Sequence, residues 1–222
     1  MAIIVFALGF LAIRTSYPTL EGSATLAGAL FGSGAAFIGA WVTEKNRDAS
    51  ERIAEERRMT AARNYFAPEL GRIIAQQIHV LGRLVPNFIA ASVGQDMPQV
   101  ETWEHFRPQQ PALYPKANQF RDLSEADAVL LINFYDSVHG IAETINKWIE
   151  TKTPQEVNSW NVLMQTVQNS LSVGELAVRQ FCPDMQLSPI MPASGTLIQN
   201  IERTRSITQQ ALAAHLSRHG AK

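Results

Sequence analysis

Apolar side chains recur at three- and four-residue spacing along most of the chain after residue 67, and this is the period of an amphipathic helix. Four segments carry the pattern: 68–89, 124–150, 153–181 and 196–218. No alternating strand pattern competes with them. The sequence therefore predicts an all-α fold whose C-terminal part is an antiparallel helical bundle.

The same spacing predicts which side chains face the core. In the first two helices these are Leu70, Ile73, Ile74, Ile78, Leu81, Leu84, Val85, Phe88 and Ile89, then Leu130, Leu131, Phe134, Val138, Ile141, Ile145 and Trp148. In the third they are Val157, Trp160, Leu163, Met164, Val167, Leu171, Leu176 and Phe181. The last helix is more polar, with Leu197, Ile198, Ile201, Leu212 and Leu216, and we expect it along the bundle surface or against a partner.

Start and stop signals set the helix ends. Ser124 is expected to cap the second helix, and Thr153, Pro154 and Glu156 form a capping-box pattern at the start of the third. Pro183 should end that helix. Two further prolines fall inside the first segment: Pro68 is expected to separate it from the preceding helix, and Pro86 to kink it or end it early.

The N-terminal region is apolar. Residues 23–42 form a run without charge that, at about 1.5 Å per residue, matches the roughly 30 Å hydrocarbon core of a bilayer. Trp41 at its polar end is typical of a membrane interface. Residues 2–13 are also apolar but short for a full span, and we interpret the pair as a membrane helical hairpin turning at 18–22. The alternative for 23–42 is a buried helix of a soluble core.

Charge around this region predicts the orientation. Arg14 alone lies in the turn, whereas Lys45, Arg47, Arg52, Arg57, Arg58 and Arg63 follow the second apolar run. The positive-inside rule then places the C-terminal domain in the cytoplasm, at the cytoplasmic membrane. Acidic residues alternate with these bases, which indicates a solvated helical stalk. The expected organisation is an anchor over 1–43, a stalk over 44–66 and a helical domain over 67–222.

Small residues follow one strip of the longer apolar segment at every fourth position: Ala24, Gly28, Gly32, Ala36 and Ala40. Small side chains allow another helix backbone to approach closely. The strip therefore predicts self-association into a homo-oligomer or packing against the first apolar segment of the same hairpin, unless it only reflects the high glycine and alanine content of membrane helices.

The connection over residues 94–118 contains too many prolines to form a helix. It also contains too many aromatic residues to be a disordered linker. We expect an ordered loop on the bundle. Its aromatics Trp103, Phe106 and Tyr114 either cap the open end of the core, which we favour, or bind a protein partner.

The glycine- and alanine-rich apolar run and the charged stalk are followed by a set of positions in and after the loop: Pro111, Leu113, Tyr114, Leu123, Phe134 and Tyr135. With this combination, residues 103–150 resemble uncharacterised bacterial membrane-anchored helical proteins. The resemblance implies an anchored helical architecture and assigns no activity.

Composition excludes several classes of function. The 222-residue chain has a net charge of −1, and its 19 Lys and Arg are dispersed, so the positive field needed to bind nucleic acid is missing. The single cysteine, Cys182, forms no internal disulfide and has no neighbouring histidine to mark it as a nucleophile. No phosphate-binding glycine loop, nucleophile elbow or dinucleotide fingerprint occurs, and we expect no cofactor.

One histidine-containing group has weak metal-binding character. Asp136, His139 and Glu143 share a helix face and offer the donors of a divalent-metal site, but only His79 stands out on another core helix to complete it. The ordinary interpretation is a solvated or interhelical polar face. His215 and His219 lie in the last turn of the chain and lack the carboxylate of a zinc-protease motif.

These patterns lead to two hypotheses about function. The first is a membrane-anchored, non-enzymatic interaction or scaffold protein with membrane lipid and an unknown protein as partners. The second is a small oligomeric membrane component, such as a pore or a transport accessory subunit, assembled through the Ala24 to Ala40 strip; against it, neither apolar run carries a charge that marks an ion pathway. An enzyme ranks third.

Overall fold

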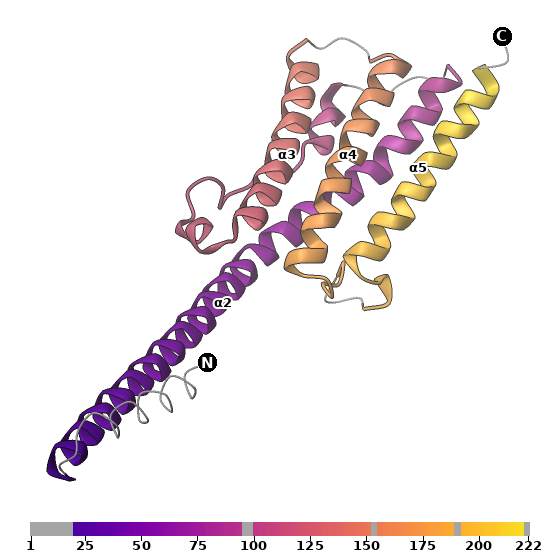
Figure 1. The fold of residues 1–222 in the computed structure, drawn as a ribbon. Coiled ribbons are helices and arrows are strands. Elements are labelled where there is room, and N and C mark those ends of the chain that lie inside the picture. Colours follow the sequence, from indigo (N-terminus) through magenta and orange to yellow (C-terminus); the bar gives the residue numbers. More distant parts are fainter. Residues whose placement is uncertain (1–19, 95–99, 152–154, 189–191, 220–222) are drawn as a thin grey trace. The chain divides into compact units, whose positions relative to one another are not determined.

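The all-α prediction is confirmed. The computed structural model describes residues 20–94, 100–151, 155–188 and 192–219. Its α-helices are α2 (Leu20–Ser92), α3 (Glu125–Thr151), α4 (Val157–Phe181) and α5 (Leu197–His219), joined through the short 3-10 helices η1 (Val100–Phe106), η2 (Asn118–Asp122) and η3 (Pro192–Ser194) (Figure 1). These ranges contain one isolated β-bridge, between Gln186 and Thr196, and no strand.

The chain divides into two compact units, Met1–Glu56 and Arg57–Lys222, so the division falls within the predicted stalk. In the first unit, α2 is helical from Leu20, and large apolar side chains face outward: Phe31 is 67% exposed, Phe37 74% and Ile38 60%. Among the described residues, no helix is both long enough and apolar enough to cross a membrane. The predicted membrane hairpin is thus without support here; residues 2–13, and the side chains of 23–27, lie outside the described part.

The predictions that Pro68 separates two helices and that Pro86 ends its helix early were wrong. Helix α2 continues through both prolines to Ser92. Each proline removes one helical hydrogen bond, to the carbonyl four residues earlier. The residues that carry those carbonyls, Asn64 and Gly82, are exposed, so water can bond to the oxygens. Both prolines also face solvent. The opposite side of α2 is buried against the bundle, and the stabilisation from this packing exceeds the cost of the two lost hydrogen bonds.

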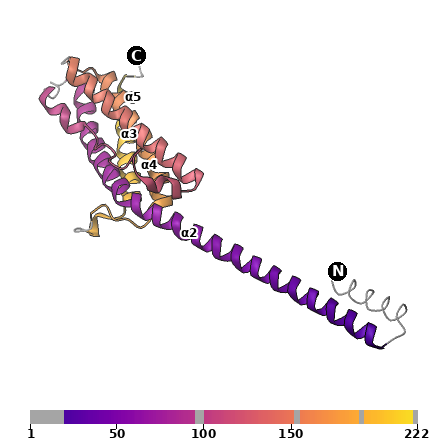
Figure 2. The same ribbon diagram turned by 90° about the vertical axis from the view of Figure 1, so that its left-hand side faces the viewer.

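The second unit is a helical bundle. Helix α4 packs against α3 on one side and α5 on the other, and neighbours run in opposite directions, with the C-terminal part of α2 alongside (Figures 1 and 2). Most predicted core positions are buried. Two of those predicted in the first three helices were wrong: Ile89 is 42% and Leu176 58% exposed. In α4 the buried side is taken by smaller residues, Gly174, Ala177 and Val178, and the helical period then places Leu176 outside.

Three helices approach closely where α4 carries small residues. A Cβ atom on Gly174 would lie 2.9 Å from Phe134 on α3 and 3.2 Å from Ile74 on α2. One turn earlier, the Ser170 hydroxyl lies 2.7 Å from the Ser137 hydroxyl and accepts a 2.9 Å hydrogen bond from Gln77 Nε2. Because the buried polar groups are paired with one another, this layer fixes the helices in one register.

The helix ends follow the sequence signals in part. The Asp127 amide donates to Ser124 Oγ at 3.2 Å, which confirms the predicted cap of α3. At α4 the prediction was shifted: Glu156 occupies the cap position itself, with no side-chain cap bond, and Thr153 and Pro154 lie outside the described residues. Helix α5 has a reciprocal capping box between Thr196 and Gln199, which the sequence analysis missed.

A buried carboxylate ties three helices together. Asp127 on α3 is 1% exposed; its Oδ2 lies 2.8 Å from both Nε and Nη2 of Arg63 on α2, and its Oδ1 accepts from Gln180 Nε2 on α4 at 2.9 Å. Burial alone would raise the pKa of Asp127, but hydrogen bonds from Gln180, Arg63 and Ser124 and the charge of Arg63 outweigh it and hold the pKa below its usual value.

We therefore expect Asp127→Asn to lower the free energy of unfolding by about 1–3 kcal/mol at neutral pH. A lowered folded-state pKa means that the ionised carboxylate stabilises the fold above the unfolded-state value of 3.8, and that this contribution disappears as the pH falls through the folded-state pKa. Urea unfolding at a series of pH values should show the difference between variant and wild type shrinking below about pH 4. Asp136→Asn, an exposed change on the same helix, is the control; an equal loss there would contradict this account.

Candidate functional site

The small-residue strip of α2 is uncovered within the described chain. Added Cβ atoms on Gly28 and Gly32 would meet nothing within 4 Å, and Ala36 and Ala40 are exposed. Ala24 lies among the residues whose side chains are not described. The strip therefore has room for a second backbone, and the described residues supply none.

Two of the three candidate partner-binding aromatics belong to the core. Trp103 is 1% and Phe106 4% exposed, and their rings meet Trp148 and Trp160 edge-on at centroid distances of 5.9 and 5.6 Å. Tyr114 is half-buried, with its ring 5.5 Å from that of Tyr135. Trp103 and Phe106 thus pack at the end of the bundle where α3 ends and α4 begins, as the favoured interpretation of the loop predicted for them, and they offer no surface to a partner.

Polar side chains of α2 hold the segment that follows η1, residues 107–117, which we call the strap. Gln76 donates to the Arg107 carbonyl at 3.2 Å and accepts from the backbone N–H of Gln109. Glu69, only 4% exposed, accepts from the amides of Ala112 at 2.6 Å and Leu113 at 3.1 Å. A buried carboxylate that accepts backbone N–H bonds is a strong, charge-assisted tie. The strap is therefore fixed to the bundle at two points.

Tyr135 lies beneath the strap. Its side chain is fully buried, and within the described ranges its hydroxyl has no hydrogen-bond partner. Burial and the nearby charge of Glu69 raise the pKa of Tyr135 well above its ordinary value, so the phenol stays protonated. An acid–base role at neutral pH is not consistent with this environment.

The predicted metal candidates do not assemble a site. Asp136 and Glu143 are exposed, His139 is half-buried, and His79 is exposed on α2. The described part of the chain holds no group of three metal-ligating side chains. The ordinary interpretation, a polar helix face, is the one that these positions favour.

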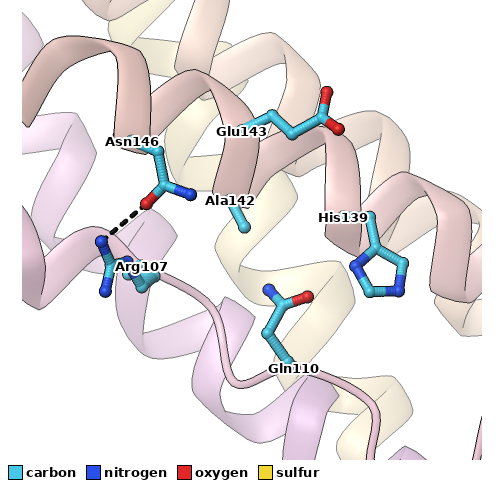
Figure 3. Close-up of a pocket in the computed structure, with 6 residues that line it drawn as sticks. All are labelled: Arg107, Gln110, His139, Ala142, Glu143 and Asn146. Atoms are coloured by element: carbon cyan, nitrogen blue, oxygen red, sulfur yellow. Dashed lines mark hydrogen bonds between the residues drawn. The ribbon is translucent and has the colours of Figure 1, made fainter. Parts of the chain in front are cut away.

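His139 and Glu143 do contribute to a pocket of about 380 Å³ that opens to solvent. It is lined on α3 by His139, Ala142, Glu143 and Asn146 and on the strap by Arg107 and Gln110 (Figure 3). Arg107 Nη2 donates to Asn146 Oδ1 at 2.6 Å, which joins the two walls. Figure 3 shows the Glu143 carboxylate directed away from Arg107 and Gln110. This pocket is the candidate functional site.

Sequence reasoning found His139 and Glu143 but missed Arg107, Gln110 and Asn146. Asn146 was detectable, since it continues the face of α3 at positions i, i+4 and i+7 from His139. The strap residues were not, because their approach to α3 depends on the hydrogen bonds from Gln76 and Glu69, which join residues more than thirty positions apart.

The other residues considered as candidates, Cys182 and His215, lie in packed surroundings. Cys182 is half-buried at the end of α4, and burial raises the pKa of its thiol to about 11, so it is not a thiolate at neutral pH. The His215 ring packs on Phe88, with centroids 5.1 Å apart. Comparison of the chain with protein-family models, with curated proteins and with solved structures finds no match.

The ties of the strap can be tested by Glu69→Ala. We expect the amides of Ala112 and Leu113 to exchange their hydrogens at least about tenfold faster, because each loses its acceptor. Hydrogen exchange resolved by peptide or by residue is the measurement. Glu69→Gln, which keeps an acceptor without the charge, should give an intermediate rate. The control is Glu104→Ala, an exposed acid in η1; unchanged exchange in Glu69→Ala would show that the strap is held by its aromatics alone.

Proposed function

We propose that the protein is a membrane-tethered docking protein without catalytic activity, anchored by its N-terminal apolar residues and presenting its helical bundle to a protein partner in the cytoplasm. The observation that carries the proposal is the set of large apolar side chains exposed on the first unit: Phe31, Phe37, Ile38 and Trp41. Apolar surface that is exposed over a contiguous area marks a contact with a membrane or with another protein.

Lipid is the occupant that this surface favours. Trp41 stands where the apolar run ends, and Lys45 Nζ lies 4.8 Å from the centre of its ring. An indole next to a lysine suits the boundary between hydrocarbon and headgroups. Beyond it, α2 becomes polar and exposed, with an Arg47–Glu51 ion pair at 2.8 Å. In the proposal, residues 2–13 and 23–42 enter the bilayer and the charged turns that follow stay in water.

The bundle supplies the docking part. Helix α5, the most polar of the C-terminal helices, keeps Leu197 and Ile201 in the core while Ile207 is 50% and Leu216 66% exposed. In the proposal, a partner that packs on α5 buries apolar surface of this kind. Absence of a recognisable catalytic motif in the sequence agrees with a binding role.

A second candidate is a small oligomeric membrane component, such as a pore or a transport accessory subunit. The open space at Gly28 and Gly32 favours it, because two such strips can pack closely in lipid. It shares the anchor with the first proposal and differs in what the anchor contacts.

Anchoring is tested by the double change Phe37→Asp and Ile38→Asp. Charged groups in the hydrocarbon core cost roughly 2.5–3.5 kcal/mol each on insertion scales, so the variant should move from the membrane fraction to the supernatant after alkaline washing. Val162→Asp on α4, at a residue 51% exposed, is the matched control and should stay with the membrane. A double variant that still resists alkaline extraction would contradict the proposed anchor.

Docking is tested by crosslinking in native membranes followed by affinity purification of the full chain. Ile207→Asp with Leu216→Asp should lose the co-purifying protein, whereas Gly28→Leu with Gly32→Leu should retain it. A ladder of self-crosslinked chains that disappears in the glycine variant, with no effect of the α5 changes, would favour the oligomeric component instead.

A further inference from the structure

The pocket between the strap and α3 presents hydrogen-bond donors from both of its walls. Arg107 carries a planar fork of five N–H donors, of which Asn146 Oδ1 takes one at 2.6 Å. That bond also orients the Asn146 amide, so its Nδ2 faces the pocket rather than Arg107 (Figure 3). The amide of Gln110 lies opposite. Donors therefore converge on one small space.

Within the described residues, no carboxylate matches the charge of Arg107. In the portion of the chain that the structure describes, the guanidinium forms no ion pair, in contrast with Arg63, Arg179 and Arg205. Of the pocket residues only Glu143 is acidic, and its carboxylate points away from Arg107. An unmatched guanidinium beside two amides is suited to bind an anion.

The pocket walls are held before any ligand arrives. Gln76 bonds to the carbonyl of Arg107, and Glu69 bonds to the amides of Ala112 and Leu113, so the strap residues on either side of Gln110 are tied down. Ala142, which is 7% exposed, forms part of the wall and leaves room above α3 because its side chain is short. A site whose donors are already fixed loses less entropy when it binds.

We propose that this pocket binds a carboxylate group, with Arg107 as the cationic partner, Asn146 and Gln110 as amide donors and His139 beside them. The proposal is independent of the membrane anchor. A carboxylate fits better than a phosphate, because its single negative charge matches the one arginine of the pocket, whereas a phosphate carries about −1.5 to −2 charges at neutral pH. The carboxylate belongs either to a free small acid or to an acidic residue of a bound protein.

The full chain in detergent micelles tests the site by NMR titration of its arginine and amide side-chain N–H signals. The probes are succinate, a capped tetrapeptide containing one aspartate, inorganic phosphate, and succinamide as the uncharged match. We expect succinate or the peptide to shift the Arg107 and Asn146 signals and succinamide to leave them unchanged. Shifts with succinate alone identify a free acid as the ligand, and shifts with the peptide alone identify a protein-borne carboxylate.

Variants assign the binding to this pocket. Arg107→Gln, an exposed change, should weaken binding roughly ten- to hundredfold, the range for loss of a charge-assisted hydrogen bond. Asn146→Leu should weaken it less, and Arg121→Gln, an exposed arginine of η2 outside the pocket, should not change it. Binding that survives Arg107→Gln, phosphate binding as strong as carboxylate binding, or no shift with any probe up to tens of millimolar would each overturn the proposal.

Discussion

The bundle depends on one close approach, at which α4 offers Gly174 and Ser170 to the side chains of α2 and α3. With no Cβ on Gly174, Phe134 and Ile74 can fill the space over its backbone. The serine one turn away satisfies Gln77 and Ser137 in the same layer. An apolar contact without a gap and a paired polar group leave little freedom for the helices to slide. The rotation of α3 about its axis is set here, and with it the faces that Asp127 and His139 occupy.

The strap shows how a segment without regular structure gains a fixed position. It packs Leu113 and Tyr114 against the bundle core, and its backbone bonds to side chains from α2 rather than to a neighbouring strand. The cost of burying the Glu69 carboxylate is offset by the amides of Ala112 and Leu113. The pocket exists because this segment lies beside α3, so its walls come from parts of the sequence that are 30 to 40 residues apart.

Local and periodic features of the fold could be predicted from the sequence, and features that depend on packing could not. The spacing of Phe134, Val138, Ile141 and Ile145 identified the buried face of α3, and Ser124 identified its start. Pro68 and Pro86 misled because their cost depends on whether the carbonyls they leave unpaired face water. Leu176 was expected in the core because it is large and apolar, although its position in the helical period places it on the outer face of α4. For the pocket, a single-helix pattern located His139 and Glu143, whereas Arg107 required knowledge of where the strap returns.

The four tryptophans divide into two environments with different consequences for spectroscopy. Trp103, Trp148 and Trp160 form a chain of edge-on contacts in the bundle core, with centroids 5.9 and 5.2 Å apart. Trp41 is 55% exposed, with a lysine ammonium over its ring. The three core indoles are close enough to exchange excitation and will report together on the integrity of the bundle. Trp41 senses only the polarity around the N-terminal helix, so a shift in its emission, isolated by replacing the other three with phenylalanine, distinguishes water from lipid.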